Sequence, residues 1–321
     1  MIKLIATDMD GTLLNAAHEI SQPNIDAIKY AQEQGITVVI ATGRAFYEAQ
    51  APVADTDLVV PYICLNGAEV RDETFNVMST SHLNKSLVHK ITKVLKDADI
   101  YYQVYTSRAI YTEDPQRDLE IYIDIAERAG QHANVERIRN GIQRRIDNGT
   151  LKVVDNYDAI EDIPGELIMK ILAFDADLEK IDKASKILAE SPNLAVSSSS
   201  RGNIEITHSD AQKGIALETI AERLGIEMKD VMAIGDNLND VSMLAKAGYP
   251  VAMENGANEV KEIAKYITDT NDVSMLAKAG YPVAMENGAN EVKEIAKYIT
   301  DTNENSGVGK AIMKLLREQQ D

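Results

Sequence analysis

Short apolar runs alternate with a helix-like pattern along most of the chain. Continuous apolar segments predict buried strands at residues 2–7, 35–41, 62–65 and 230–234. Between the first two, Ser21 suits the N-cap of a helix, Pro23 its first turn, and Gly35 its C-terminal end. Strands and helices in this order predict a parallel sheet of the α/β class through about residue 83.

The pattern changes between residues 84 and 206. This stretch predicts a mixture of helices and hairpins, at 87–95, 100–105, 109–112, 167–174, 178–188, 194–199 and 203–207. Such a mixture lacks the strand–helix–strand order of the flanks and is typical of an α+β module. We therefore expect a discontinuous core of residues 1–83 and 207–321, interrupted by a module at 84–206.

Polar side chains gather after two of the predicted core strands. Asp8 and Asp10 follow the first strand two residues apart, and Asp236 follows a later one, together with Asn239 and Asp240. In open α/β sheets, ligands bind at the carboxyl ends of strands. Clustered carboxylates repel unless a cation neutralises them or one stays protonated. Taken alone, the first pair would fit a plain Asp-Gly turn equally well, and Asn239-Asp240 a plain helix N-cap. Together they favour a Mg²⁺ site.

Two further segments suit an anion. Thr42-Gly43-Arg44 follows the second strand and offers a hydroxyl and backbone N–H groups to a phosphate oxygen. Lys213-Gly214 opens a predicted helix, where a cation is unfavourable to the helix dipole unless an anion lies nearby. Each segment is a weak signal, but together they predict a site that handles phosphate.

In this order, the segments resemble the four motifs of the haloacid dehalogenase superfamily: Asp8-x-Asp10-Gly-Thr, Thr42-Gly-Arg, Lys213-Gly and Gly-Asp236-x-x-Asn239-Asp240. The branch they resemble most is the Cof-type phosphatases, which Asn66-Gly67-Ala68 also fits. This branch carries a type-II cap between the second and third motifs. The resemblance implies a Rossmann-like doubly wound parallel sheet core with an inserted α+β cap domain.

The resemblance also implies an activity, a Mg²⁺-dependent phosphomonoester hydrolysis through an aspartyl-phosphate. Asp8 would be the nucleophile, and Asp10 would protonate the leaving alcohol and then activate water. The metal ligands would be Asp8, Asp236 and the backbone carbonyl of Asp10.

The remaining motif residues would hold the phosphate. Thr42, Gly43 and Lys213 would bind its non-bridging oxygens, and Asn239 would orient either the phosphate or Lys213. Asp240 would hold the water molecules that bind the metal, without binding the metal itself. Two alternatives stay open: a phosphomutase of the same fold, and an inactive or binding protein if a duplication near the end of the chain disrupts the core. The cap chooses the substrate through side chains whose direction the sequence does not reveal.

Composition narrows the partners to small molecules. The net charge of −18, from 33 basic and 51 acidic residues, argues against a nucleic-acid binder. The expected partner is a small phosphorylated metabolite such as a sugar phosphate, drawn in by a metal and local cations. With no long apolar run and no signal peptide, we expect a cytoplasmic protein without membrane contact. The single cysteine, Cys64, is expected to be buried and inert. A monomer and a homodimer both remain open.

One segment is duplicated without change. Residues 271–302 repeat all 32 residues of 239–270, and removing one copy leaves 289 residues. Solenoids need several stacked repeats, so an in-frame duplication or a sequence-assembly error fits better. The second copy lacks the preceding Gly-Asp and cannot form a second site. The first copy should join the core as a helix at 241–247, a strand at 249–252, a helix at 258–266 and a strand at 267–268. The second should extend the sheet edge with residues 281–284 or swap into another chain.

Overall fold

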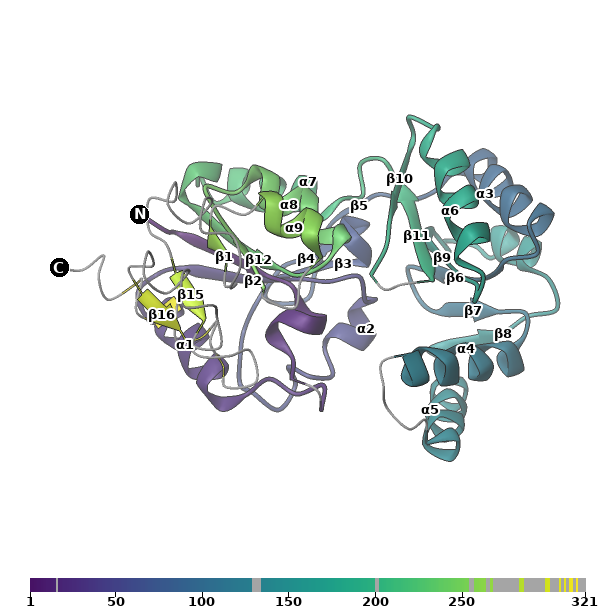
Figure 1. The fold of residues 1–321 in the computed structure, drawn as a ribbon, viewed down its shortest axis with the longest axis horizontal. Helices are drawn as coiled ribbons and strands as arrows, with labels where there is room; N and C mark the ends of the chain where they lie inside the picture. Colours follow the sequence, from purple (N-terminus) through teal and green to yellow (C-terminus); the bar gives the residue numbers. More distant parts are fainter. Residues whose placement is uncertain are drawn as a thin grey trace. The chain divides into compact units, whose positions relative to one another are not determined.

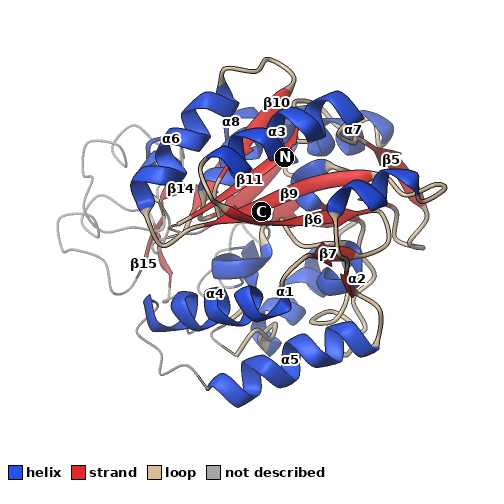
Figure 2. Ribbon diagram, turned by 90° about the vertical axis from the view of Figure 1, so that its right-hand side faces the viewer, coloured by secondary structure: helices blue, strands red, loops and turns tan. Residues whose placement is uncertain are grey.

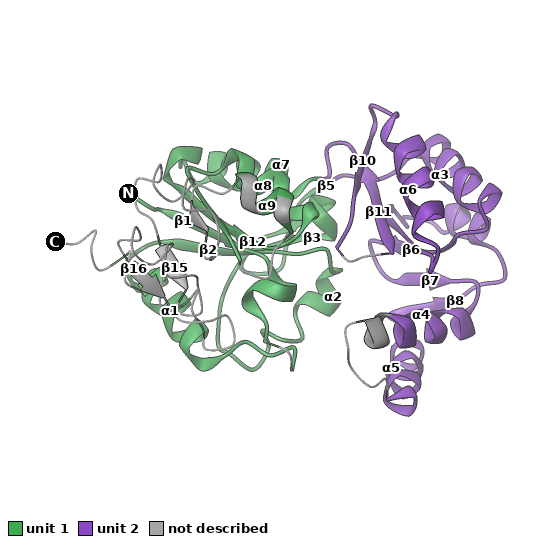
Figure 3. Cartoon of the chain, viewed as in Figure 1, with its two compact units in different colours: residues 1–80, 212–321 green, residues 81–211 purple. Residues whose placement is uncertain are grey.

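The chain divides into two compact units. The computed structural model describes residues 1–15, 17–128, 134–199, 202–253, 257–263, 266–267, 283–285, 298–300, 306, 309, 312–313 and 316. One unit comprises Met1–Thr80 with Gln212–Asp321, and the other Ser81–Ala211 (Figure 3). The limits expected for the inserted module were residues 84 and 206.

An eight-stranded sheet forms the centre of the first unit, in the order β14-β13-β12-β1-β2-β3-β4-β5 (Figure 1). Its strands are β1 (Leu4–Thr7), β2 (Thr37–Ala41), β3 (Tyr62–Cys64), β4 (Glu69–Arg71), β5 (Val77–Thr80), β12 (Val231–Gly235), β13 (Tyr249–Ala252) and β14 (Tyr266–Ile267). All pairs from β14 to β3 are parallel, whereas β4 and β5 pair antiparallel. The strand order changes direction at β1, which lies between β2 and β12. Doubly wound sheets bind ligands at such a switch point.

Helices cover both faces of this sheet. They are α1 (Gln22–Glu33), α2 (Phe46–Ala49), α7 (Lys213–Arg223), α8 (Val241–Lys246) and α9 (Asn258–Ile263). Alternate residues of β1 pack on opposite faces of the sheet. Ile5 belongs to the apolar cluster that contains Ile28 of α1, and Leu4 belongs to the cluster that contains Leu217 of α7. This double burial explains why β1 reads as a continuous apolar run. Cys64 of β3 is buried, and burial raises the pKa of its thiol.

The second unit contains a six-stranded sheet in the order β10-β11-β9-β6-β7-β8. Its strands are β6 (Tyr101–Thr106), β7 (Ile110–Thr112), β8 (Leu151–Val153), β9 (Ile168–Phe174), β10 (Leu194–Ser197) and β11 (Asn203–His208). The helices α3 (Lys85–Asp97) and α6 (Leu178–Ala189) pack on one face of this sheet (Figure 2). The predicted hairpin β6–β7 and the antiparallel pair β10–β11 are confirmed.

Two helices of the second unit, α4 (Pro115–Arg128) and α5 (Val135–Asp147), were not predicted. Within α5 only Ile142 is buried, but Val135, Ile138, Ile142 and Ile146 recur three and four positions apart, a helical apolar stripe that was not recognised among the charged residues. None of the helices in the described part of the chain has the length and apolar character needed to cross a bilayer.

The first copy of the repeat lies in the core, as predicted, and supplies α8, β13, α9 and β14. The expected extension of the sheet edge by the second copy is wrong for its described residues. Its strands β15 (Val283–Met285) and β16 (Tyr298–Thr300) instead pair parallel in a sheet of their own.

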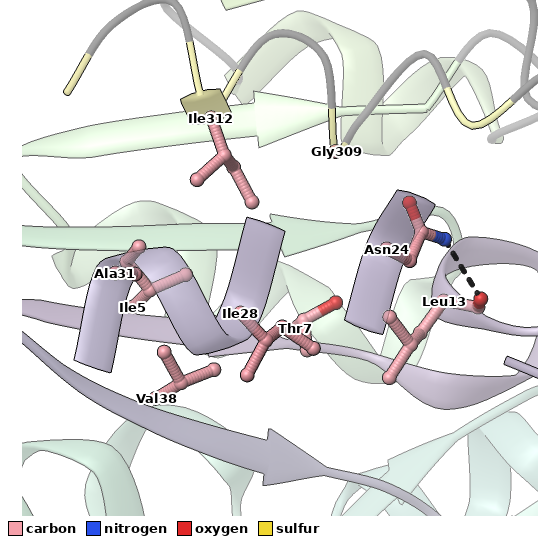
Figure 4. Close-up of a pocket in the computed structure, with 9 residues that line it drawn as sticks. All are labelled: Ile5, Thr7, Leu13, Asn24, Ile28, Ala31, Val38, Gly309 and Ile312. Carbon is pink, nitrogen blue, oxygen red and sulfur yellow. Dashed lines mark hydrogen bonds between the residues drawn. The ribbon is translucent and has the colours of Figure 1, made fainter. Parts of the chain in front are cut away.

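After the second copy, described residues of the chain pack against α1. Ile312 and Leu316 are buried in the same apolar cluster as α1, and the hydroxyls of Ser306 and Ser21 lie 2.6 Å apart. Gly309 and Ile312 line a small cavity with residues of β1, β2 and α1 (Figure 4). A Cβ atom at Gly309 would lie 2.7 Å from the Asn24 Oδ1, so glycine permits this close approach. The core therefore holds the chain on both sides of the duplicated segment.

Candidate active site

Three carboxylates meet at the carboxyl ends of β1 and β12. Asp8, Asp236 and Asp240 are buried, and one oxygen from each lies within 4.8 Å of the others. The backbone N–H of Asp8 donates to the carbonyl of Ile234 at 2.9 Å, which ties the end of β1 to β12. Residues more than 220 positions apart are thus adjacent because their strands are neighbours.

Lys213, the first residue of α7, joins this cluster. Its Nζ donates to Oδ1 of Asp8 and to Oδ1 of Asp240, each at 2.6 Å, and its side chain is fully buried. The other oxygen of Asp240 accepts the backbone N–H groups of Asp236 at 2.9 Å and Asn237 at 3.0 Å. Asp240 therefore fixes both the lysine and the turn that carries Asp236.

Gly214 allows α7 to begin so close to the site. A Cβ atom there would lie 2.1 Å from the carbonyl oxygen of Ser242 in α8, and the Gly214 N–H donates to the Ser242 hydroxyl at 3.0 Å. Any larger residue would push the start of α7, and Lys213 with it, away from α8. This contact is a physical reason for the Lys-Gly pair.

The cluster is electrostatically strained by its surplus of negative charge. Burial, followed by the nearby Asp240 charge, raises the pKa of Asp8 well above its usual range, while Lys213 opposes this. Burial and the Asp240 charge also raise the pKa of Asp236, to about 6. Burial alone would lower the pKa of Lys213, but the charges of Asp240 and Asp8 raise it overall. Three carboxylates facing one ammonium leave the site in need of a cation.

The turn after β1 positions Asp236. Gly11 has a φ of 83°, and a Cβ atom there would lie 2.5 Å from Oδ2 of Asp236. The next residue, Thr12, donates its hydroxyl to Oδ1 of Asp236 at 2.8 Å. No role was predicted for Thr12 from the sequence, although its place directly after the glycine turn was a usable signal.

Asp10 does not share the buried cluster. Its carboxylate is 49% exposed and forms a two-point ion pair with Arg44, whose Nε lies 2.8 Å from Oδ2 and whose terminal nitrogen lies 2.5 Å from Oδ1. Burial would lower the pKa of Arg44, but Asp10 raises it overall. Arg44 is a second residue whose contact was not predicted.

Thr42 directly follows β2 and is buried. Its N–H donates to Ile63 at 2.8 Å, its hydroxyl accepts the N–H of Arg44 at 3.1 Å, and its carbonyl accepts the N–H of Asn66 at 3.0 Å. Gly43 follows it directly. The strand-end loops of β2 and β3 are therefore joined beside the site.

Asn66 and Gly67 connect this loop to the others. Asn66 has a φ of 58°, in the left-handed region, and its Oδ1 accepts from Nδ2 of Asn239 at 3.1 Å. A Cβ atom at Gly67 would lie 2.5 Å from the carbonyl oxygen of Gln212, the residue before Lys213. Lys213 itself is oriented by Asp8 and Asp240, whereas the side chain of Asn239 contacts Asn66.

The donor set of the cluster fits a hard divalent cation. Asp8, Asp236 and Asp240 offer only carboxylate oxygens, the ligands that Mg²⁺ and Ca²⁺ prefer. The acidic surplus described above gives such an ion a favourable electrostatic environment.

Comparison with known proteins agrees with this geometry. The haloacid dehalogenase-like hydrolase family profile matches residues 5–272 and, separately, 269–312. A phosphatase of Bacillus subtilis, YwtE, named for 5-amino-6-(5-phospho-D-ribitylamino)uracil, is 35% identical over 267 residues, which are 83% of this chain and 92% of the relative. Phosphatase YwpJ of the same organism is 32% identical over 265 residues, 82% and 93% of the two chains.

A solved structure extends the likeness to nearly the whole chain. It is a haloacid dehalogenase-like hydrolase from B. subtilis, 28% identical, with a TM-score of 0.74 over 97% of this chain and 99% of its own. The chain therefore belongs to the haloacid dehalogenase superfamily and, within it, to the Cof-type phosphatases.

Proposed function

We propose that the protein hydrolyses phosphomonoesters of small metabolites through an aspartyl-phosphate on Asp8, with Mg²⁺ as its metal. The observation that carries this proposal is the Asp8 carboxylate, buried at the switch point of the sheet beside two further carboxylates and a lysine. Asp8, Asp236 and the backbone carbonyl of Asp10 would hold the ion. When bound, Mg²⁺ would neutralise these carboxylates and the phosphate and polarise the bond to be broken.

The chain's own residues would divide the reaction into two displacements. A carboxylate oxygen of Asp8 attacks phosphorus in line, and the bond from phosphorus to the substrate oxygen breaks. Asp10, protonated and released from its ion pair with Arg44, gives its proton to that departing oxygen. Asp10 then takes a proton from water, which attacks the phosphoryl group, releases phosphate and restores the Asp8 carboxylate.

The remaining residues would hold the phosphoryl group. Lys213 would offer its ammonium to the non-bridging oxygens while Asp240 keeps it in place, and Thr42 and Gly43 would donate from the opposite loop. Asn239 would contribute its amide only by releasing or sharing the hydrogen bond to Asn66. Its own Oδ1 is buried and accepts from nothing in the described part of the chain, so a substrate hydroxyl or a water would reach it only if the side chain moved.

The proposed substrates are phosphate esters of sugars or sugar alcohols. The YwtE phosphatase is named for a phosphorylated ribityl compound, which is a phosphate ester of a sugar alcohol. The test is phosphate release from a panel of sugar phosphates, sugar-alcohol phosphates and the ribitylaminouracil phosphate itself, with Mg²⁺. Inorganic phosphate without an isomerised sugar phosphate supports a hydrolase. Isomerised product without phosphate would indicate the phosphomutase alternative, and no turnover of any substrate would favour a binding protein.

The proton-transfer role of Asp10 predicts a dependence on the leaving group. Asp10→Asn should lower kcat for an alkyl phosphate by about a hundredfold or more, the scale of a general acid–base catalyst. The first displacement from an aryl phosphate should suffer far less, because a phenolate needs no proton to depart. Rapid-quench measurement of the released alcohol or phenol gives the rate of the first displacement for each ester. Equal losses in the first displacement would contradict the role.

Metal binding should depend on pH with a defined sign. The pKa of Asp236 in the folded protein is about 6, above its ordinary 3.8, so the metal-free fold holds extra protons and loses stability as pH rises across that window. A divalent ion needs deprotonated carboxylates and competes with those protons. Mg²⁺ should therefore raise the Tm little near pH 5 and increasingly through about pH 7.5.

Calorimetry at several pH values checks this expectation, with Asp236→Asn as the control. That variant should fold and lose most of the Mg²⁺-induced increase in Tm. An equal increase at both ends of the pH range, or an undiminished one in Asp236→Asn, would speak against this metal site.

A further inference from the structure

The place beside β12 is filled by residues that exist twice in the chain. β13 pairs with β12 through contacts such as Met232 with Tyr249 and Ile234 with Val251. Behind this pair, Met243 and Leu244 of α8 are buried in the same cluster as Ala252. Each of these first-copy residues has an identical counterpart 32 positions later. β12 and α7 each occur once in the chain. The surface that they form can therefore be covered by either of two segments with the same sequence.

The second copy also forms the same strand pair. In the core, Val251 is opposite Tyr266 and Ala252 is opposite Ile267. In the separate sheet, Val283 is opposite Tyr298 and Ala284 is opposite Ile299, which is the same register shifted by one repeat. The β15–β16 pair thus has the backbone pairing that the position beside β12 requires.

Chain connectivity does not force the first copy into that position. The described residues after the repeat are anchored to α1 through Ser306, Ile312 and Leu316. Thr300 of β16 precedes Ser306 by only six residues, whereas Ile267 of β14 precedes it by thirty-nine. Either copy can occupy the position beside β12 while the other copy forms a loop in the connection between the core and the residues after the repeat. The loops in the two arrangements have equal length, so closing them costs a similar entropy.

We propose that the surface formed by β12 and α7 accepts either copy, so that β15–β16 can replace β13–β14 within the same chain. The packing against β12 and α7 is identical in both arrangements, and only the connections differ. If the second copy replaces the first only from a point after Asp240, the residues from Asp236 to Asp240 remain one continuous segment. The carboxylate cluster is then the same in both arrangements. The exchange does not depend on which reaction the site performs.

A buried charge placed in one copy at a time tests this exchange in the full chain. Ala252 is completely buried in β13, so Ala252→Asp would place a carboxylate in an apolar cluster without a partner. Ala284→Asp makes the same change in the second copy. We expect each single variant to unfold cooperatively, with a Tm within about 5 °C of the unmodified chain. The double variant should lose the transition.

Two controls make the outcomes decisive. Ala233→Asp alters an equally buried but unrepeated residue of β12, and this single change should abolish the transition. An Ala252→Asp variant as damaged as the double variant would overturn the proposal, because only the first copy would then fit. Severe damage from Ala284→Asp alone would overturn it too, because the second copy would be needed elsewhere. Light scattering completes the test. A folded Ala252→Asp monomer supports exchange within one chain, whereas a folded dimer would overturn it in favour of exchange between chains.

Discussion

Asp8→Asn is expected to lower kcat by at least about a thousandfold, the scale of losing a covalent nucleophile. Asparagine keeps the shape of the side chain but has no anionic oxygen to attack phosphorus. The buried position of Asp8, beside β12 and Lys213, leaves little room for another group to take over. Steady-state turnover of the best substrate, measured with saturating Mg²⁺, gives the value.

The fold should survive this substitution. Burial and neighbouring carboxylates raise the pKa of Asp8, so its charge is unfavourable in the metal-free protein. Lys213 keeps its second partner, Asp240, when Asp8 becomes neutral. A thermal transition close to that of the unmodified chain would therefore assign the loss to chemistry. An Asp8→Asn variant with near-normal turnover would refute the nucleophile.

Lys213→Ala is expected to cost about 2–4 kcal/mol in kcat/KM, the effect of removing a charged contact to the transferring phosphoryl group. The metal-free protein should also lose about 3–5 kcal/mol of stability, because Asp8 and Asp240 would be left buried without their shared cation. Kinetics with saturating Mg²⁺, below the melting range of the variant, separate the catalytic loss from the structural one.

Arg144→Ala is the matched control for Lys213→Ala. Arg144 is an exposed cation of α5, and among the described residues its guanidinium donates only to the backbone carbonyl of Asn140, at 3.3 Å. Removing it should leave both kcat/KM and stability nearly unchanged. A larger catalytic loss from Arg144→Ala than from Lys213→Ala would show that Arg144, and not Lys213, carries the phosphate contact.

The sequence allowed the carboxylate cluster to be predicted but not the direction of Asp10. Asp8 and Asp236 could be placed together because each follows an apolar strand, and parallel strands end at one edge. On a continuing strand, the two-residue spacing of Asp8 and Asp10 would place both side chains on one face. In fact β1 ends at Thr7, and Gly11 then turns the chain with a positive φ, so strand alternation no longer applies. Asp10 consequently lies outside the cluster, against Arg44.

Contacts that depend on the backbone conformation could not be predicted from the sequence either. Asn239 contacts Asn66, 173 residues away, and that contact depends on the left-handed conformation of Asn66. The helix α5 was missed although Val135, Ile138, Ile142 and Ile146 recur at helical spacing, because charged and polar residues outnumber these four in the segment. The repeat was evident at once, but two identical segments cannot indicate which one the core selects.

The covalent step is the central claim, and acyl-phosphate trapping tests it most directly. Asp10→Asn should still accept phosphate from 4-nitrophenyl phosphate but release it slowly, so the phosphorylated enzyme accumulates. A burst of about one equivalent of 4-nitrophenolate is expected, followed by slow turnover. Borohydride reduction and peptide mass analysis should then find homoserine at position 8, and only when both Mg²⁺ and substrate are present. Homoserine at another position, or a full burst from the Asp8→Asn/Asp10→Asn double variant, would contradict the account.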